Sequence, residues 1–347
     1  MITIRKLAAA LWYARHLARV SWVPAAQLLA RIERRNHVVA VHEGVTFAEL
    51  TPRVAIFCHF DRAGRVREPT RIYLEALRSE GLSVVVVTNA GWLAEPDLAW
   101  LRKRTAAIVI RRNVGYDFAA WRDALARLQL PRRDTQLLLL INDSMYGPFA
   151  PLGAMLARFD FSSVDIWGLT DSWQHRFHLQ SYLLAFGPRA LASECFATFW
   201  KDVRDIRSKW GVIKNYEIGL TQYFMAAGLR CQAVWPYMSL IAAAKRRAVV
   251  KANDRLDDND PFGVAARKAE NHILRAAVAS APMNPTTELW RLLLEAGFPF
   301  LKRELLRENP ARVSDIAAWR TVLEERLGQD TGVVIRDLER CLRQRTP

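Results

Sequence analysis

Short apolar runs alternate with amphipathic segments along the chain from residue 53 onward. Residues 54–58, 82–88, 106–110 and 137–141 are almost continuously apolar and are bounded by polar or turn residues, a pattern typical of strands buried on both faces of a parallel sheet. Helical spacing of apolar residues separates the first three runs. This alternation predicts βαβ units with right-handed crossovers, and therefore an α/β fold with an open, mostly parallel sheet covered by helices.

The second half of the chain continues the pattern with fewer strands. Residues 165–171 and 181–186 read as strands, and residues 215–228 as a helix that ends at Gly228. An acid-rich stretch at 254–260 is typical of a lid-like or simply solvated loop. Beyond it the pattern is helical, which predicts three regions: an N-terminal helical extension (1–50), a main domain (51–245), and a loop with C-terminal helices packed on that domain (246–347).

The N-terminal segment combines positive charge with apolar residues. Residues 1–37 carry seven Arg and Lys residues against one acid, Glu33. Arg15 and Arg19 interrupt the apolar positions, so the segment is too charged to span a membrane comfortably. A basic amphipathic helix with Trp at its flanks suits the interface of an anionic bilayer. The alternative is a helix that docks on the domain through its apolar side.

Composition and charge limit the classes of partner that the protein is expected to bind. The formal net charge of +15 over 347 residues favours anionic partners such as nucleic acid, an acidic membrane surface or a phosphorylated substrate. The sequence lacks the helix-turn-helix, zinc-finger and aromatic-basic sheet signatures of nucleic-acid-binding proteins, which disfavours that class. Four widely spaced cysteines, without paired spacing, argue against a zinc site or a disulfide framework and fit a reducing, cytoplasmic compartment.

Polar residues follow two of the predicted strands directly. Asn142, Asp143 and Ser144 come after the run at 137–141, and His59 and Asp61 come after the run at 54–58. Ligands of open α/β sheets bind at the carboxyl ends of the strands, so these side chains are placed to meet a diphosphate, a metal or a ribose. The alternative is that they cap local turns. Dinucleotide-binding and P-loop glycine motifs are absent from the sequence, which excludes the usual signatures of those enzymes.

Four separated motifs carry a family resemblance. In order they are Asn113-Val-Gly-Tyr-Asp-Phe-Ala-Ala-Trp121, Asn142-Asp-Ser-Met-Tyr-Gly-Pro148, Trp167-Gly-Leu-Thr-Asp171, and Asn284-Pro-Thr with Pro299-Phe-Leu-Lys-Arg-Glu-Leu-Leu306. Over about residues 53–310 the chain resembles the rhamnan synthesis F family of bacterial polysaccharide proteins. It also resembles a divergent GT-A glycosyltransferase. The resemblance implies that Asn113, Gly115 and Asp117 bind the nucleotide or sugar of a nucleoside diphosphate donor, together with the residues at the two strand ends.

The resemblance is incomplete at the metal-binding motif. Asn142-Asp143-Ser144 stands where many GT-A enzymes have Asp-x-Asp, so Asp143 supplies a single carboxylate for Mg²⁺ or Mn²⁺. Such hard cations take oxygen ligands and offset diphosphate charge. Screening of the leaving diphosphate by cations such as Lys302 and Arg303 is the alternative.

The resemblance also assigns the acceptor side. Glu217 occupies the position of the general base of inverting GT-A enzymes, at the start of the helix predicted over 215–228. The alternative role for that residue is to stabilise a helix N-terminus. Asp171 and His178, which flank the strand-like segments of the second half, are the candidate acceptor contacts; His175 fits an ordinary histidine better.

Together these features predict a membrane-associated cytoplasmic enzyme. It would move a sugar, with rhamnose as the candidate, from a nucleoside diphosphate donor to a cell-surface polysaccharide or lipopolysaccharide, with inversion. The competing hypothesis is a non-catalytic glycosyltransferase-like module that binds glycan or a polysaccharide synthase. Release of nucleoside diphosphate distinguishes the two.

Overall fold

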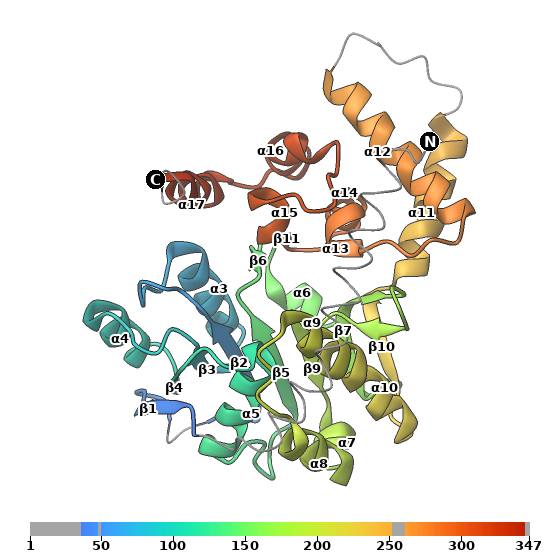
Figure 1. Cartoon of the computed structure of the whole chain (residues 1–347). Helices are drawn as coiled ribbons and strands as arrows, with labels where there is room; N and C mark the ends of the chain where they lie inside the picture. The colour runs from blue at the N-terminus through green and yellow to red at the C-terminus, as the bar shows by residue number, and fades with distance from the viewer. Residues whose placement is uncertain (1–35, 48–49, 252–260, 344–347) are drawn as a thin grey trace, which may run out of the picture.

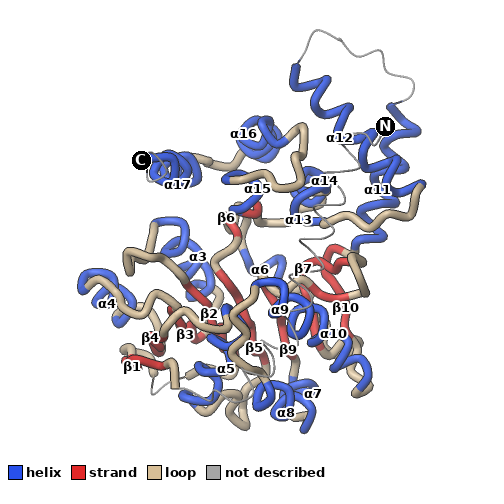
Figure 2. The backbone as a smooth tube through the Cα atoms, viewed as in Figure 1, coloured by secondary structure: helices blue, strands red, loops and turns tan. Residues whose placement is uncertain are grey.

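The computed structural model describes residues 36–47, 50–251 and 261–343, and a central sheet runs through it. Its strands lie in the order β1-β4-β3-β2-β5-β9-β7-β10, with β8 paired to β7 (Figures 1 and 2). Their bounds are β1 Val38–Glu43, β2 Arg53–His59, β3 Ser83–Thr88, β4 Ala107–Arg111, β5 Leu137–Asn142, β7 Ile166–Ser172, β8 His178–Leu179, β9 Leu183–Phe186 and β10 Cys231–Trp235.

The strand directions confirm the predicted α/β class. β2 pairs in parallel with both β3 and β5, and β4 continues the parallel block on the far side of β3. β9 runs antiparallel between β5 and β7, and β10 pairs in parallel with β7. The side chains of β3, β4 and β5 are buried along the whole of each strand, as expected for apolar runs covered by helices on both faces.

The strand β1 corrects the predicted N-terminal boundary. The helical extension was expected to reach residue 50, but Val38–Glu43 pairs antiparallel with β4 at the edge of the sheet. Burial alternates along this strand, as it does in an edge strand that is covered on one face. Its β-branched valines favour extended backbone. The predicted basic helix and its proposed membrane contact involve residues 1–35, which lie outside the described residues.

Helices cover both faces of the sheet. One face packs mainly against α3 (Glu68–Ser79), α4 (Glu95–Arg102) and α6 (Leu152–Leu156). The other packs against α5 (Tyr116–Leu128), α8 (Glu194–Asp202) and α10 (Ile218–Ala226), through aromatic side chains that include Phe118, Trp121 and Phe224. The short helices α7 (Pro188–Leu191) and α9 (Lys209–Val212) complete this layer. The sheet is thus held rigidly, with the carboxyl ends of β2–β5 at one edge.

The C-terminal region is helical, as predicted, but it also adds a strand. It contains α11 (Tyr237–Lys251), α12 (Pro261–Val278), α13 (Pro285–Glu288), α14 (Trp290–Glu295), β11 (Leu301–Lys302), α15 (Arg303–Arg307), α16 (Trp319–Thr321) and α17 (Gly332–Arg343). The main domain was predicted to end at residue 245, but α11 runs through that position. The acid-rich loop at 254–260 lies outside the described residues.

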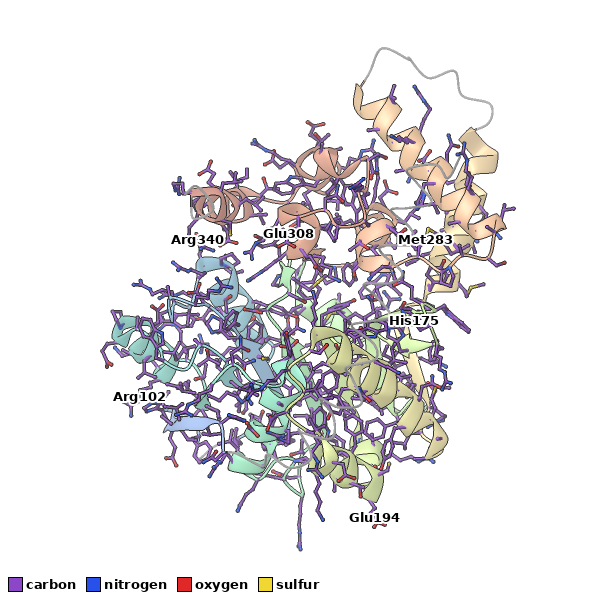
Figure 3. The ribbon with its side chains drawn as sticks, viewed as in Figure 1. Arg102, His175, Glu194, Met283, Glu308 and Arg340 are labelled. Carbon is purple, nitrogen blue, oxygen red and sulfur yellow. The ribbon has the colours of Figure 1, made fainter. Side chains whose placement is uncertain are left out.

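Strand β11 ties this region to the end of the sheet. It pairs antiparallel with β6 (Met145–Tyr146), which directly follows Asn142-Asp143-Ser144. The contact continues in backbone hydrogen bonds from Arg303 N to the Ser144 carbonyl (2.9 Å) and from Phe149 N to the Pro299 carbonyl (2.8 Å). The C-terminal layer therefore lies above the carboxyl edge of the sheet, where Figure 3 shows Glu308 and Arg340.

Candidate active site

A cavity of about 360 Å³ opens at the carboxyl edge of β5. Its walls come from the start of α5, the segment after β5, the β7–β8 hairpin, the helical segment around α9, and β11. Six of the residues predicted from the sequence line it, namely Asp117, Asn142, Ser144, His178, Glu217 and Lys302. These residues are up to 185 positions apart in the chain (302 − 117), and the fold brings them to one surface.

A buried arginine organises the strand ends beneath the cavity. Arg111, at the end of β4, is fully buried and donates to Asn89 Oδ1 (2.5 Å) and to Asp123 Oδ2 (2.9 Å). It also donates to the Val114 carbonyl (2.8 Å), which fixes the turn into α5. A buried charge with several well-placed acceptors is costly to disturb, so this cluster holds the motif at 113–121 rigidly against the sheet.

Gly115 allows the backbone to make the sharp turn into α5. It has φ +81°, and a Cβ atom at its position would lie 2.5 Å from the Ala119 Cβ and 3.1 Å from Asp205. Only glycine fits that left-handed, crowded position. The glycine of the motif is thus explained by the sharp entry into α5, and Asp117 follows in the first turn of that helix.

Two residues at strand ends donate hydrogen bonds to the carboxylate of Asp117. Its Oδ2 accepts from Asn142 Nδ2 (2.8 Å), and its Oδ1 accepts from the thiol of Cys58 (3.4 Å). Burial, with a smaller contribution from the charge of Asp143, raises the pKa of Asp117 to about 6. The carboxyl group therefore changes charge near neutral pH, at the floor of the cavity.

The segment after β5 folds into a compact polar turn. Asn142 Oδ1 accepts from both the backbone N–H (3.1 Å) and the hydroxyl (2.6 Å) of Ser144. Half-buried Asp143 accepts through Oδ2 from the backbone N–H of Phe60, at the end of β2 (3.1 Å). Among the described residues, no three His, Cys, Asp or Glu side chains are grouped to hold a metal. Asp143 Oδ1 and the Ser144 hydroxyl are the oxygen donors that this turn can offer a cation.

Glu217 lies within a helical segment rather than at its start. Ser208 caps α9 by accepting from Gly211 N, and the helix continues through a π-helical turn (Ile213–Glu217) into α10. The predicted start at residue 215 was therefore wrong, because the polar residues at 214–215 interrupt the apolar spacing without ending the helix. The alternative role of capping a helix N-terminus does not fit this position. π-Helical turns occur frequently at functional sites.

The carboxylate of Glu217 is oriented by the β8–β9 segment. Its Oε2 accepts from the backbone N–H of Ser181 (3.3 Å) and from the Ser181 hydroxyl. Its Oε1 lies 3.7 Å from Nε2 of His178. His178 donates through Nδ1 to the Arg176 carbonyl (2.8 Å), which fixes the imidazole ring. One carboxylate oxygen is thus anchored, and the other faces an imidazole at the cavity wall.

Lys302 brings a cation from the C-terminal layer into the cavity. The β6–β11 pairing places it opposite Met145. Burial lowers the pKa of Lys302, while the carboxylates of Glu217 and Glu304 act in the opposite direction. Glu304 also pairs with Lys209 at the rim (3.3 Å). A partly desolvated ammonium group beside a hydrogen-bonded carboxylate can bind the negative charge of a substrate.

Other residues predicted for the site do not line the cavity. His59 is buried and bonds Thr88 Oγ1 (3.0 Å), and burial lowers its pKa. Asp61 accepts from Arg67 Nε (2.8 Å). Asn113 is exposed on the turn before α5. Arg303 donates to the Met145 carbonyl (3.2 Å) and lies over the ring of Tyr146 (5.1 Å). These side chains surround the cavity but do not form its surface.

Asp171 also acts from outside the cavity. It is buried, and its two oxygens accept from Tyr237 N (2.7 Å) and from Trp173 Nε1 (3.1 Å). Burial raises its pKa. Asp171 therefore fixes the base of the β7–β8 hairpin and the start of α11, and its hairpin neighbours Ser172 and Gln174 reach the cavity.

Sequence reasoning missed several lining residues. They are Tyr116, Gln174, Gln180, Trp210 and Asn284, together with His175, which had been read as an ordinary histidine. The Asn-Pro pair at 284 was a signal, since its motif had been noted. Nothing in the hydrophobic pattern distinguishes Trp210 from a core residue of a helix, because its position in the cavity depends on the packing of α9.

The chain is similar to several known proteins. Residues 84–259 match the family described as rhamnan synthesis protein F. The virulence protein VirA of Vibrio anguillarum is 31% identical over 263 residues, which cover 74% of this chain and 80% of that protein.

Similar solved structures include the mannosyltransferase PcManGT from Pyrobaculum calidifontis in complex with GDP-Man and Mn²⁺. It is 14% identical with a TM-score of 0.36, covering 91% of this chain and 96% of that one. Another is a nucleotide-diphospho-sugar transferase from Desulfovibrio desulfuricans, assigned provisionally, which is 12% identical with a TM-score of 0.32, covering 54% of this chain and 80% of that one. Within the described part of the chain, no helix is long and apolar enough to cross a membrane.

Proposed function

The chain belongs to the rhamnan synthesis protein F family, and from this premise we propose that it is a glycosyltransferase. It moves a sugar, rhamnose in our proposal, from a nucleoside diphosphate donor to a bacterial cell-surface polysaccharide or lipopolysaccharide. One observation carries the proposal beyond the family. A hydrogen-bonded carboxylate (Glu217), a desolvated cation (Lys302) and two polar side chains after β5 (Asn142 and Ser144) meet in one cavity large enough for a sugar.

The donor occupies the side of the cavity formed by α5 and the end of β5. Asp117 and Asn142 form hydrogen bonds with the hydroxyl groups of the sugar or of the ribose. Asp143 and Ser144 face the diphosphate. A divalent cation, when bound there, would offset phosphate charge through Asp143 with water and phosphate oxygens as its other ligands. Lys302 supplies a positive charge from the opposite wall, so that the leaving diphosphate is stabilised by protein groups as well.

Glu217 acts as the general base in this proposal. The acceptor hydroxyl attacks the anomeric carbon as the bond to the diphosphate breaks, and Oε1 of Glu217 receives the hydroxyl proton. The Ser181 hydrogen bonds keep the carboxylate oriented. Attack from the side opposite the leaving group inverts the anomeric centre, and the transition state has oxocarbenium character.

The proposal places the enzyme in the cytoplasm at the inner face of the membrane. The support is the charge of residues 1–37, with seven cations and one acid, because clustered cations bind anionic lipid. Vesicle sedimentation compares the full chain with a form in which Arg15 and Arg19 are replaced by Glu. Equal binding of the two forms to anionic vesicles contradicts the membrane assignment.

Donor binding is tested by melting the purified protein with a panel of nucleoside diphosphate sugars, with and without Mg²⁺ or Mn²⁺. A ligand at a hundred times its dissociation constant stabilises the fold by about 2.7 kcal/mol, which shifts the melting temperature measurably. We expect a selective shift with one nucleoside diphosphate sugar of the panel, followed by release of nucleoside diphosphate when acceptor is added. No shift across the panel would instead favour a non-catalytic glycan-binding module.

A further inference from the structure

The cavity has a second side, formed by the β7–β8 hairpin, the segment before β9, α9 and the start of α13. Its side chains are neutral amides, a hydroxyl and two aromatic rings, namely Ser172, Gln174, His175, Gln180, Trp210 and Asn284. The function proposed above assigns no role to these residues beyond leaving space for an acceptor. Their chemistry nevertheless restricts what can bind there.

Two aromatic rings meet at the mouth of this side. The His175 imidazole lies 4.9 Å from the Trp210 indole, edge to face at 62°. His175 has φ +69°, a backbone conformation that non-glycine residues rarely adopt. The hairpin tip thus holds an uncommon conformation in which its ring contacts α9, and Figure 3 shows His175 at the edge of the sheet layer, below Met283. An aromatic surface at a cavity mouth binds the apolar C–H face of a flat ligand.

The amides behind these rings are held in fixed orientations. Gln180 Oε1 accepts from the Thr170 hydroxyl (2.7 Å), and its Nε2 donates to Asn284 Oδ1 (3.2 Å). Asn284 Oδ1 also accepts from the backbone N–H (3.1 Å) and the hydroxyl (2.9 Å) of Thr286. Within the described residues, no hydrogen bond uses the Asn284 Nδ2 donors, so they remain for a ligand at the cavity surface.

The charges near this side are already paired or belong to the reacting centre. Lys209 pairs with Glu304 at the rim, and Lys302 lies beside Glu217. The six residues of this side include no carboxylate, lysine or arginine. A phosphate or carboxylate group would gain little here, whereas a neutral ring with several hydroxyl groups would satisfy amide donors and stack on indole.

We propose that this side binds the neutral terminal pyranose of a glycan chain as the acceptor, an inference that rests on the proposed function. The ring stacks against Trp210 and His175, and its hydroxyl groups bond Gln174 and Asn284. One hydroxyl is then directed toward Glu217, on the neighbouring wall of the same cavity. The acceptor is accordingly a growing, uncharged sugar chain rather than a lipid phosphate or an acidic sugar.

The test titrates short rhamnose oligosaccharides into the full-length protein by calorimetry without donor, with glucuronic acid oligosaccharides of matched length as the charged comparison. Trp210→Ala and His175→Ala should each weaken rhamnose-oligosaccharide binding by about tenfold, and Trp210→Phe should retain most of it. In transfer assays the acceptor KM should rise for the two alanine variants, while the donor-induced melting shift, which also shows that each variant is folded, stays as in the wild type.

Trp92→Ala is the matched control and should bind glycan as the wild type does. This tryptophan, on the loop between β3 and α4, is 51% exposed and does not line the cavity. Equal acceptor affinity in Trp210→Ala, His175→Ala and the wild type overturns the inference, as does preferred binding of the acidic oligosaccharide or the absence of any glycan binding by the wild type. A wild-type protein that binds glycan through Trp210 but shows no donor shift refutes the proposed transfer and leaves this site supported.

Discussion

The phenol of Tyr146 donates a 2.7 Å hydrogen bond to Asp337, joining the strand after the site to α17, which is 191 residues further along the chain. Arg307 (2.7 Å) and Arg340 (2.6 Å) donate to the same carboxylate, which is almost fully buried. Arg307 also donates to the Tyr146 hydroxyl (3.2 Å). This cluster holds β6, and with it the polar turn after β5, against the C-terminal layer.

Asp337→Asn should destabilise the protein. The substitution leaves two arginines facing a neutral amide, and breaking a buried charge pair costs about 3 kcal/mol or more, enough to lower the melting temperature by several degrees. Glu339→Gln, at an exposed position of the same helix, is the control and should melt with the wild type. An unchanged melting temperature for Asp337→Asn would show that the cluster contributes no net stability.

The same carboxylate predicts an acid-dependent loss of stability. Burial alone would raise the pKa of Asp337, but its hydrogen bonds to Arg340, Tyr146 and Arg307 lower it to about 2. The unfolded chain titrates near 3.9, so the contribution of roughly 2 kcal/mol is present above that pH and is lost as the pH falls toward 2. The difference in melting temperature between wild type and Asp337→Asn should therefore shrink from pH 6 to pH 3.

Asp117 predicts the opposite dependence. Burial and the Asp143 charge raise its pKa to about 6, so the folded state prefers the protonated form. That preference favours folding fully below about pH 4 and is lost as the pH rises through 6. Asp117→Asn should therefore melt higher than the wild type at pH 8, by a few degrees, and close to it at pH 4. A variant that melts lower at pH 8 would mean that the ionised carboxylate stabilises the turn.

Glu217→Gln should abolish transfer while donor binding remains. A neutral amide still accepts the Ser181 hydrogen bonds but cannot take a proton, and loss of a general base costs about 10²- to 10⁴-fold in kcat. Glu304→Gln, at the rim of the cavity, is the control that keeps the base. Turnover by Glu217→Gln at the wild-type rate, measured as released nucleoside diphosphate, would reject the assignment.

Lys302→Met should weaken donor binding. Removing a charge-assisted hydrogen bond costs about 1.5 kcal/mol or more, which is roughly a tenfold rise in the donor dissociation constant. The measurement is the donor-induced melting shift at increasing salt. Lys209→Met removes an exposed cation whose partner is Glu304 and should change the shift little. Equal weakening by both variants would indicate a general effect of charge at the rim.

The fold was predictable where the chain carries strong local patterns. The strands β2 to β5 are continuous apolar runs between turn residues, so burial on both faces could be read directly from them. β1 was missed because its alternating pattern is short and follows a basic segment. The π-helical turn at Glu217 was not predicted either, because it changes the backbone without changing the spacing of polar and apolar residues.

The candidate site was predictable only at the strand ends. Asn142 could be placed there because parallel strands share a carboxyl edge, whereas Asp117 was assigned only through the family resemblance. The separation of Lys302 from Arg303 could not be foreseen, because it depends on the short strand β11 ending at Lys302 and α15 beginning at Arg303. Lys302 lines the cavity, whereas Arg303 turns to Tyr146.

The β6–β11 pairing also determines which segments of the chain are needed for a complete cavity. The segment that matches the family, residues 84–259, contains Asp117, Asp143 and Glu217 but neither β2 nor Lys302. A recombinant form limited to that segment would leave β6 without its partner strand and would lose one wall of the cavity. Chimaeric proteins built from two relatives should therefore exchange the sheet and residues 284–340 together, because the two parts are joined by the β6–β11 pairing.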